Sequence, residues 1–214
     1  HFAKAGTPTM GGVLILGAVM VATLLFARLD NPYVWLVLFV TICYGALGFV
    51  DDYAKVSAGN TDGVPARIRL IVGFVLAGIV SACAVWVQPP ELEYGLALPF
   101  VNGLIVNLAW FYIPFVIVVI VGSANAVNLT DGLDGLAIMP VMIAAGSLGV
   151  IAYAVGRTDF TEYLGVQYVP GTGELLIFCA ALIGGGLGFL WYNAPPAAVF
   201  MGDTGSLALG GALG

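Results

Sequence analysis

The chain has 214 residues, of which 61% are hydrophobic and only 8% are charged, and its formal net charge is −6. Its mean hydropathy is +1.05. These values exclude an ordinary soluble globular protein and indicate an integral membrane protein. The acidic balance argues against a nucleic-acid partner, because contact with a phosphate backbone calls for a basic stripe.

The predicted elements follow from long stretches that lack Asp, Glu, Lys and Arg. Each has at least about 20 residues, enough for a helix to cross a hydrocarbon core roughly 30 Å thick. In chain order we predict spans over 11–28, 32–50, 68–87, 104–122, 134–155 and 175–192, and part of a seventh from about Ser206. The expected fold class is an all-α membrane protein, a polytopic transmembrane helix bundle with residues 1–214 in a single integral membrane domain. Because the chain starts without Met and stops within an apolar run, we expect a piece of a longer protein.

The basic residues predict which ends of the spans face the cytoplasm. With the N-terminus inside, the inside segments carry four Lys and Arg residues against two outside, in agreement with the positive-inside rule. This topology places the N-terminal segment and residues 51–67, 123–133 and 193–205 on one face. The outside segment 88–103 alternates weakly between apolar and polar residues, which predicts a short β-hairpin.

Two adjacent carboxylates, Asp51 and Asp52, stand in GFVDDYAKV at the inner end of the second span, followed by Lys55. Adjacent side chains on a helix point about 100° apart, so one carboxylate can bind a metal while the other faces a different partner. The structural alternative is that the pair only caps a helix end at the membrane boundary.

A second polar motif, SANAVNLTDGLDGLA, lies between the fourth and fifth predicted spans and contains Asn125, Asn128, Asp131 and Asp134. Asn and Asp are natural helix N-caps, but capping explains one such residue and not four. Polar groups at membrane depth are costly and usually functional. The motif therefore favours a functional site.

Two glycine-rich segments precede predicted helices on the same face. One is AKAGTPTMGG near the N-terminus, and the other is GDTGS, residues 202–206 within WYNAPPAAVFMGDTGSLALGG. Glycines at a helix N-terminus let backbone N–H groups approach a phosphate, and the helix dipole favours an anion there. Together the two segments indicate a phosphate-containing ligand.

Five aspartates, at positions 51, 52, 131, 134 and 203, are expected to converge on this face, where they would repel a bare pyrophosphate. Oxygen ligands without His or Cys point to Mg²⁺ or Mn²⁺, which bridges carboxylates to phosphate oxygens.

Two rival interpretations of these motifs exist. A transporter or channel predicts charges near mid-span, whereas these aspartates lie at span ends, and a plain membrane scaffold gives no reason for all the motifs to share one face.

The segments KAGTPTMGG, GFVDDYAKV, NAVNLTDGLDGLA and VFMGDTGSLALGG resemble, in the same order, the signature segments of the phospho-N-acetylmuramoyl-pentapeptide transferase family. The resemblance runs from Lys4 to the last residue. It implies Mg²⁺-dependent transfer from UDP-N-acetylmuramoyl-pentapeptide to undecaprenyl phosphate, giving lipid I and UMP for peptidoglycan. It also implies a fold of about ten helices, often a homodimer, in the bacterial inner membrane with its site on the cytoplasmic face.

Residue roles follow from the same resemblance. It implies that Asp51, Asp52 and Asp203 are catalytic and that Asp203 and Asp51 bind the metal. Arg67 is a further candidate substrate contact. The expected substrate-binding residues are Lys4, Thr9, Lys55, Asn128, Asp131, Gly132, Leu133, Asn193 and Phe200, with Phe200 stacking on uracil and Gly132 and Leu133 in the uridine pocket.

The sequence departs from the family in one respect, since the C-terminal triple-His segment is absent. We therefore expect this fragment to be inactive by itself. Two mechanisms remain open. In one, the lipid phosphate attacks the β-phosphate directly, and Asp52 positions or deprotonates this acceptor. In the other, an aspartyl phosphate forms first.

Overall fold

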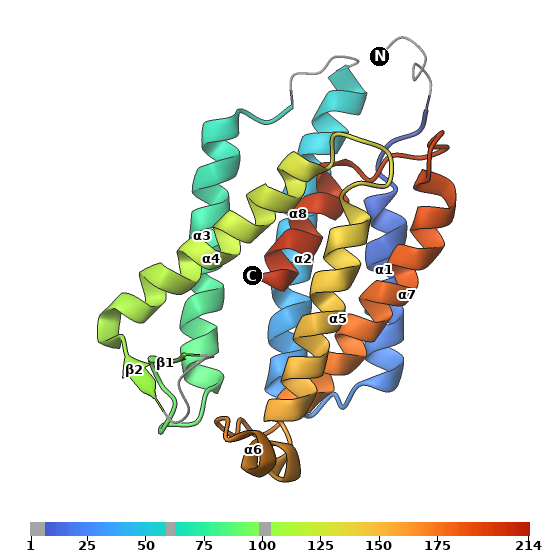
Figure 1. The fold of residues 1–214 in the computed structure, drawn as a ribbon. Coiled ribbons are helices and arrows are strands. Elements are labelled where there is room, and N and C mark those ends of the chain that lie inside the picture. The colour runs from blue at the N-terminus through green and yellow to red at the C-terminus, as the bar shows by residue number, and fades with distance from the viewer. Residues whose placement is uncertain (1–6, 59–62, 99–103) are drawn as a thin grey trace.

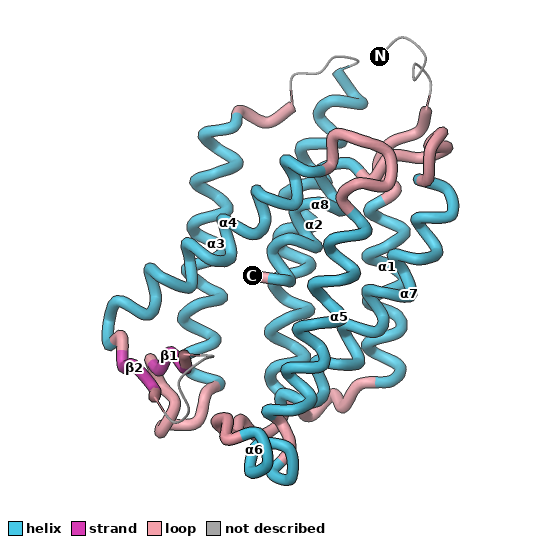
Figure 2. The backbone as a smooth tube through the Cα atoms, in the orientation of Figure 1, coloured by secondary structure: helices cyan, strands magenta, loops and turns pink. Residues whose placement is uncertain are grey.

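The computed structural model describes residues 7–58, 63–98 and 104–214, which form a bundle of long helices (Figures 1 and 2). A small hairpin and a short helix lie together at one end of the bundle. The elements, in chain order, are α1 (Gly12–Phe26), α2 (Pro32–Ala58), α3 (Ala66–Val87), β1 (Gly95–Ala97), β2 (Ile105–Asn107), the 3₁₀ turn η2 (Ala109–Phe111), α4 (Tyr112–Thr130), α5 (Ile138–Val155), α6 (Thr158–Leu164), the 3₁₀ turn η3 (Thr172–Glu174), α7 (Leu175–Asn193) and α8 (Gly202–Leu213).

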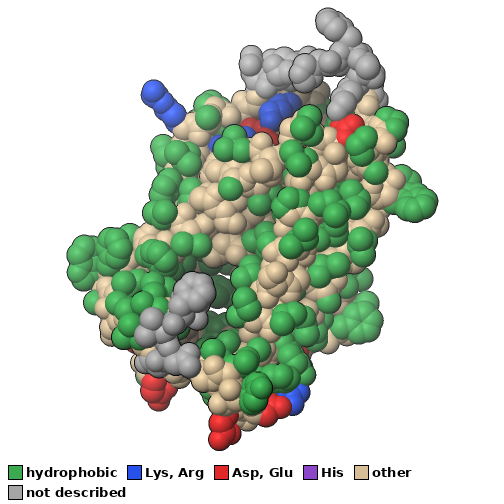
Figure 3. All heavy atoms as spheres, viewed as in Figure 1, with side chains coloured by type: hydrophobic (Ala, Val, Ile, Leu, Met, Phe, Trp, Pro, Cys, Tyr) green, Lys and Arg blue, Asp and Glu red, His purple; other side chains and the backbone are tan. Residues whose placement is uncertain are grey.

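The helices form because their sequences are apolar on every face, and a helix satisfies its own backbone hydrogen bonds in lipid. Five helical segments of the described chain are long and apolar enough to cross a membrane: 32–57, 66–87, 109–130, 138–155 and 172–193. Large apolar side chains cover the outside of the bundle (Figure 3), among them Trp86, Leu14 and Ile71. The expected class, an all-α polytopic membrane protein, is confirmed.

The first predicted span is shorter than expected, because α1 has 15 residues. The described part of the chain therefore holds five helices of spanning length, besides α1 and the 12-residue α8.

Helix α8 lies at the centre of the bundle between α1, α2 and α4, and every residue from 204 to 211 is buried. Close backbone contact makes this possible. A Cβ on Gly48 of α2 would lie 2.1 Å from the Asp203 carbonyl oxygen, and a Cβ on Gly12 of α1 would lie 2.2 Å from the Gly205 nitrogen. Small residues are typical of such membrane-helix contacts.

Two predicted helix boundaries were wrong. Helix α2 continues past residue 50 to Ala58, and α4 begins at Tyr112 and runs to Thr130. Asp51, Lys55 and Asn128 therefore lie on helices and not in loops. The reason is that a charge marks the edge of the hydrocarbon core, whereas a helix ends only where its hydrogen bonding ends.

The expected hairpin exists, although its second strand lies beyond the predicted segment. Strands β1 and β2 pair antiparallel with Gly95 opposite Asn107. Residues 105–107 had been assigned to the fourth span. The second outer connection contains the unpredicted helix α6, which ends at Gly165 in the left-handed conformation.

Candidate functional site

The predicted polar motifs meet at one end of the bundle. Here α2, α4 and α7 end and α3, α5 and α8 begin, as Figure 1 shows. A cavity of about 230 Å³ opens between them. Its lining consists of Thr9, Asp52, Lys55, Asp131, Gly132, Leu133, Asp134, Asn193, Phe200, Gly202 and Asp203. Nine of the expected site residues are thus brought together, and Lys4 lies outside the described residues.

Backbone hydrogen bonds join two distant segments of the chain beside this cavity. The amide of Phe200 donates to the Pro8 carbonyl at 2.9 Å, and the amide of Gly11 donates back to the Phe200 carbonyl at 2.8 Å. The two glycine-rich segments that the sequence singled out are therefore neighbours, joined at Phe200.

Asp203, in the first turn of α8, accepts three hydrogen bonds from side chains of other helices. Its Oδ2 accepts hydrogen bonds from Lys55 Nζ at 2.7 Å and from Arg69 Nη1 at 2.9 Å. Its Oδ1 accepts from Asn128 Nδ2 at 2.6 Å. Asn128 itself is not part of the cavity lining, and its Nδ2 also donates to the Ser206 hydroxyl at 2.9 Å.

Asp51 shares the same two cations. Its Oδ2 lies 2.5 Å from Lys55 Nζ and 3.6 Å from Arg69 Nη1, as ion pairs, while its Oδ1 accepts from the Val64 amide at 2.8 Å. Although Oδ2 is buried, it makes no hydrogen bond of good geometry. An oxygen in this position is suited to a further cationic partner.

Asp52 faces a different partner, as the 100° separation predicts. Its Oδ1 accepts from the Asp203 amide at 3.0 Å, and its Oδ2 accepts from the Thr204 amide at 2.8 Å and the Thr204 hydroxyl at 2.7 Å. The amides at the start of α8 had been expected to face a phosphate. That interpretation was wrong for Asp203 and Thr204, because the Asp52 carboxylate occupies this anion position.

The donor set fits a divalent metal ion. Asp51, Asp52 and Asp203 each offer a carboxylate oxygen, and these oxygens lie within 4.8 Å of one another. Lys55 and Arg69 pair with Asp51 and Asp203, and Asp52 makes no ion pair with a described Lys or Arg, so this cluster holds more carboxyl groups than cations. Hard oxygen ligands and a surplus of negative charge are what Mg²⁺ and Mn²⁺ require.

The pKa values of two carboxyl groups outside the spanning segments are shifted in opposite directions. Burial raises the pKa of Asp131 to about 7, assisted by the negative charge of Asp203 and opposed by a hydrogen bond from the Gly202 backbone. Burial also acts to raise the pKa of Asp203, but the hydrogen bonds that its carboxylate accepts from Lys55 and Asn128 outweigh it and lower the pKa to about 2. Asp203 is therefore ionised at neutral pH, whereas the pKa of Asp131 lies close to neutral pH.

Asn193 holds two loops in place. Its Oδ1 accepts from the Gly135 amide at 2.8 Å, and its Nδ2 donates to the Val199 carbonyl at 2.8 Å. Nearby, Asp134 Oδ2 accepts from the Ala197 amide at 3.2 Å. These bonds join the segment after α4 to the segment after α7, so they set the position of Gly132 and Leu133 in the cavity wall.

Arg69 is the site residue that sequence reasoning missed. In the sequence analysis it counted only toward the positive-inside rule. A usable signal was its position as the one charged residue of the predicted span 68–87, at the end that carries the polar motifs. The structure places its guanidinium on Asp203 and Asp51. Arg67 differs, since it is exposed and does not line the described cavity.

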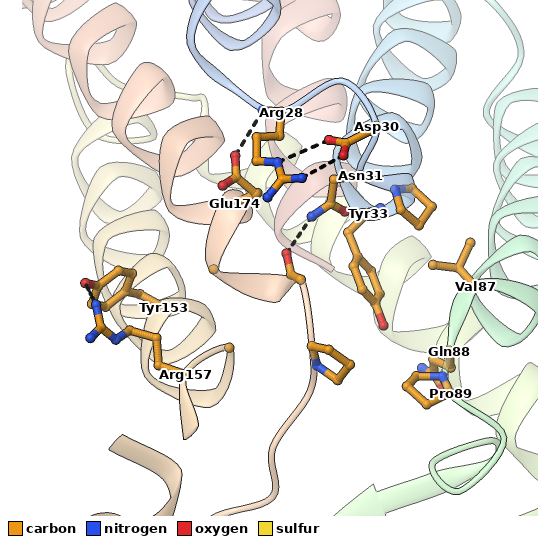
Figure 4. Close-up of a pocket in the computed structure, with 15 residues that line it drawn as sticks. Arg28, Asp30, Asn31, Tyr33, Val87, Gln88, Pro89, Tyr153, Arg157 and Glu174 are labelled. Atoms are coloured by element: carbon orange, nitrogen blue, oxygen red, sulfur yellow. Dashed lines mark hydrogen bonds and ion pairs between the residues drawn. The ribbon is translucent and has the colours of Figure 1, made fainter. Parts of the chain in front are cut away.

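A larger cavity of about 580 Å³ lies at the opposite end of the bundle (Figure 4). The cationic groups drawn there are already engaged. Arg28 pairs with Asp30 at 2.7 Å, and Arg157 donates to Tyr153 at 2.7 Å and also pairs with Asp159. Both arginines of this cavity are thus paired with a carboxylate within two residues along the chain, whereas Lys55 and Arg69 pair with Asp203 on a different helix.

Fold and site together define an integral membrane protein with a carboxylate-rich, metal-compatible centre at one end of its helices. The chain belongs to glycosyl transferase family 4, whose sequence pattern matches residues 34–214. Residues 4–16 also match the phospho-N-acetylmuramoyl-pentapeptide-transferase signature 1.

Curated relatives agree with this assignment. The chain is 70% identical over 214 residues to the phospho-N-acetylmuramoyl-pentapeptide-transferase of Ruegeria pomeroyi and 69% identical over 214 residues to that of Ruegeria sp. strain TM1040. These alignments cover 100% of this chain and 59% of each relative. The protein of the same description from Dinoroseobacter shibae is 68% identical over 211 residues, which are 99% of this chain and 58% of the relative.

Proposed function

We propose that the protein transfers phospho-N-acetylmuramoyl-pentapeptide from its UDP donor to undecaprenyl phosphate, giving lipid I and UMP, at the cytoplasmic face of the bacterial inner membrane. The observation that carries this proposal is the carboxylate and cation cluster around Asp203, at the end of the bundle where the signature segments meet. A donor soluble in water and an acceptor anchored in lipid both reach such a position. The described chain is one integral membrane domain of the transferase.

The groups around the cavity suit a phosphoryl transfer. An oxygen of the lipid phosphate bonds to the β-phosphorus, the bond from that phosphorus to the bridging oxygen breaks, and UMP leaves. The acceptor is a phosphate monoester whose second pKa is about 6, so at pH 7 it is mostly ionised and needs little help from a base. Lys55 and Arg69 stabilise the negative oxygens in the transition state.

Asp203 and Asp51 would hold Mg²⁺, which supplies neutralisation of the pyrophosphate charge when it is bound. Asn128 and the two cations fix the Asp203 side chain. Phe200 provides an aromatic face for uracil, and Gly132 and Leu133 form the adjoining wall. Thr9 and Asn193 complete the pocket, and Asp131 lies beside Asp203. We also propose that Lys4 contacts the substrate. The protein is further proposed to act as a homodimer.

Direct displacement is the mechanism we favour over an aspartyl phosphate. Asp203 is paired with two cations, and Asp52 accepts three hydrogen bonds, so the negative charges of these two carboxylates are already compensated. Such compensation lowers nucleophilicity. Incubation with labelled donor and no acceptor should leave no acid-stable label on the protein, and a labelled aspartate would require the two-step route.

The test is transfer of radiolabelled phospho-muramoyl-pentapeptide to undecaprenyl phosphate by the full-length protein, with and without Mg²⁺. Asp203→Asn should lower the metal-dependent rate by at least about 100-fold. The matched control is Asp159→Asn, which changes an exposed carboxylate of α6 at the opposite end. Equal rates in the two variants would refute the site, and transfer only from UDP-N-acetylglucosamine would refute the substrate.

A further inference from the structure

Helix α8 lacks a cap from its own sequence. The residue at the N-cap position is Met201, whose side chain makes no capping hydrogen bond. The second and third amides of a helix normally find an acceptor on the N-cap side chain. In α8 these amides belong to Asp203 and Thr204, and both donate to Asp52 on α2, 151 and 152 residues earlier in the chain.

The surrounding backbone is shaped for this contact. Gly202 has a φ of +77°, and a Cβ on it would lie 2.6 Å from Asp52 Oδ2. A side chain at position 202 would thus push the carboxylate away from the amides. Gly48, one turn before Asp52, lets the two backbones touch at the same point.

The charge pattern separates Asp52 from its neighbours. Asp51 and Asp203 both pair with Lys55 and Arg69, whereas Asp52 makes no ion pair with the Lys and Arg residues that the structure describes. Its charge is balanced by the N-terminal end of the α8 dipole. Only 4% of Asp52 is exposed, and both of its oxygens already accept hydrogen bonds.

We propose that Asp52 is a positioning residue, which caps α8 from a different helix and so aims the Asp203 side chain into the cavity, and that it exchanges no proton with the acceptor. The effect of this cap on catalysis rests on the proposed function. The cap itself is a property of the protein without substrate. Asp51 and Asp203 then remain as the carboxylates that face the metal and the phosphates.

The test uses the full-length protein with Asp52→Asn and Thr204→Val. The asparagine loses one acceptor and turns an NH₂ group toward N–H donors, and the valine removes one of the three donors to Asp52. The control is Thr41→Val, because the buried Thr41 hydroxyl bonds only within α2, to the Val37 carbonyl. Thr204→Val also keeps the inference testable if Asp52→Asn does not fold.

Hydrogen exchange of residues 200–208 without Mg²⁺ or substrate measures the cap. Asp52→Asn should raise the exchange rate there roughly tenfold, as loss of a helix cap does, with a smaller rise for Thr204→Val and none for Thr41→Val. Unchanged protection in both site variants would overturn the proposal.

Two further readouts separate positioning from proton transfer and from a purely structural role. Mn²⁺ affinity, measured by electron paramagnetic resonance, should fall in Thr204→Val although Thr204 carries no carboxylate; unchanged affinity counts against positioning. The acid limb of the transfer rate against pH should keep its midpoint in Asp52→Asn, and loss of that limb would show that Asp52 is the base. If the wild type transfers no phospho-sugar, the proposed function fails while the exchange data still judge the cap.

Discussion

Replacing Gly48 by Ala tests whether contact between α2 and α8 sets the site. The added Cβ would lie 2.1 Å from the Asp203 carbonyl oxygen and 2.6 Å from the Thr204 nitrogen, well inside the 3.4 Å at which ordinary contact begins. The atoms it meets are backbone, so the start of α8 must shift as a unit. Asp203 and the amides that bind Asp52 would move with it.

The expected cost combines two opposing effects. Overpacking a tight contact destabilises by about 1–3 kcal/mol, while Ala in place of Gly in a helix returns up to about 1 kcal/mol. The net loss should lower the thermal midpoint by a few degrees, measured in detergent on the full-length protein. The effect on transfer should be larger, because a misplacement of about 1 Å at a reacting centre costs on the order of 100-fold in rate.

Gly184→Ala in α7 is the matched control, since a Cβ there has nothing within 4 Å. It carries the same propensity gain without the contact, so it should be as stable as the wild type or more so. If Gly48→Ala retains the stability and transfer rate of Gly184→Ala, the argument that α2 and α8 position Asp203 through their backbones is refuted.

Three other predictions concern the cavity. Arg69→Gln should lower the transfer rate by about 10- to 100-fold because it removes a cation from Asp203, whereas Arg67→Gln should change it little; equal effects in steady-state assays would contradict the ion pair. For Asp131 the folded pKa of about 7 exceeds the ordinary 3.8. The wild type without metal should therefore lose stability as pH rises from about 4 through 7, and in pH-dependent thermal unfolding Asp131→Asn should lack this slope. Asn193→Ala leaves the Gly135 amide and Val199 carbonyl unsatisfied, which should cost about 1–3 kcal/mol of unfolding free energy; a loss below about 0.5 kcal/mol would show that the loops hold without it.

The sequence by itself determined the class of fold and the face that bears the site. Each membrane helix satisfies its own backbone, so local hydropathy is enough to find most of the spans. Charges are expelled to span ends, so their positions also predict that the Asp-bearing motifs share one end of the bundle. The convergence of Asp52, Asp131 and Asp203 in one cavity followed this expectation.

Only the tertiary structure decided the partners within that site. Whether Asp52 faces a phosphate or the amides of α8 depends on how two helices 151 residues apart pack, and no local pattern encodes this. The same holds for Arg69, whose guanidinium reaches Asp203 because α3 lies beside α2. The ends of α2 and α4 and the second strand of the hairpin also depended on hydrogen bonds that hydropathy does not report. Composition fixes where a residue can lie in a membrane, but packing fixes which atom it meets.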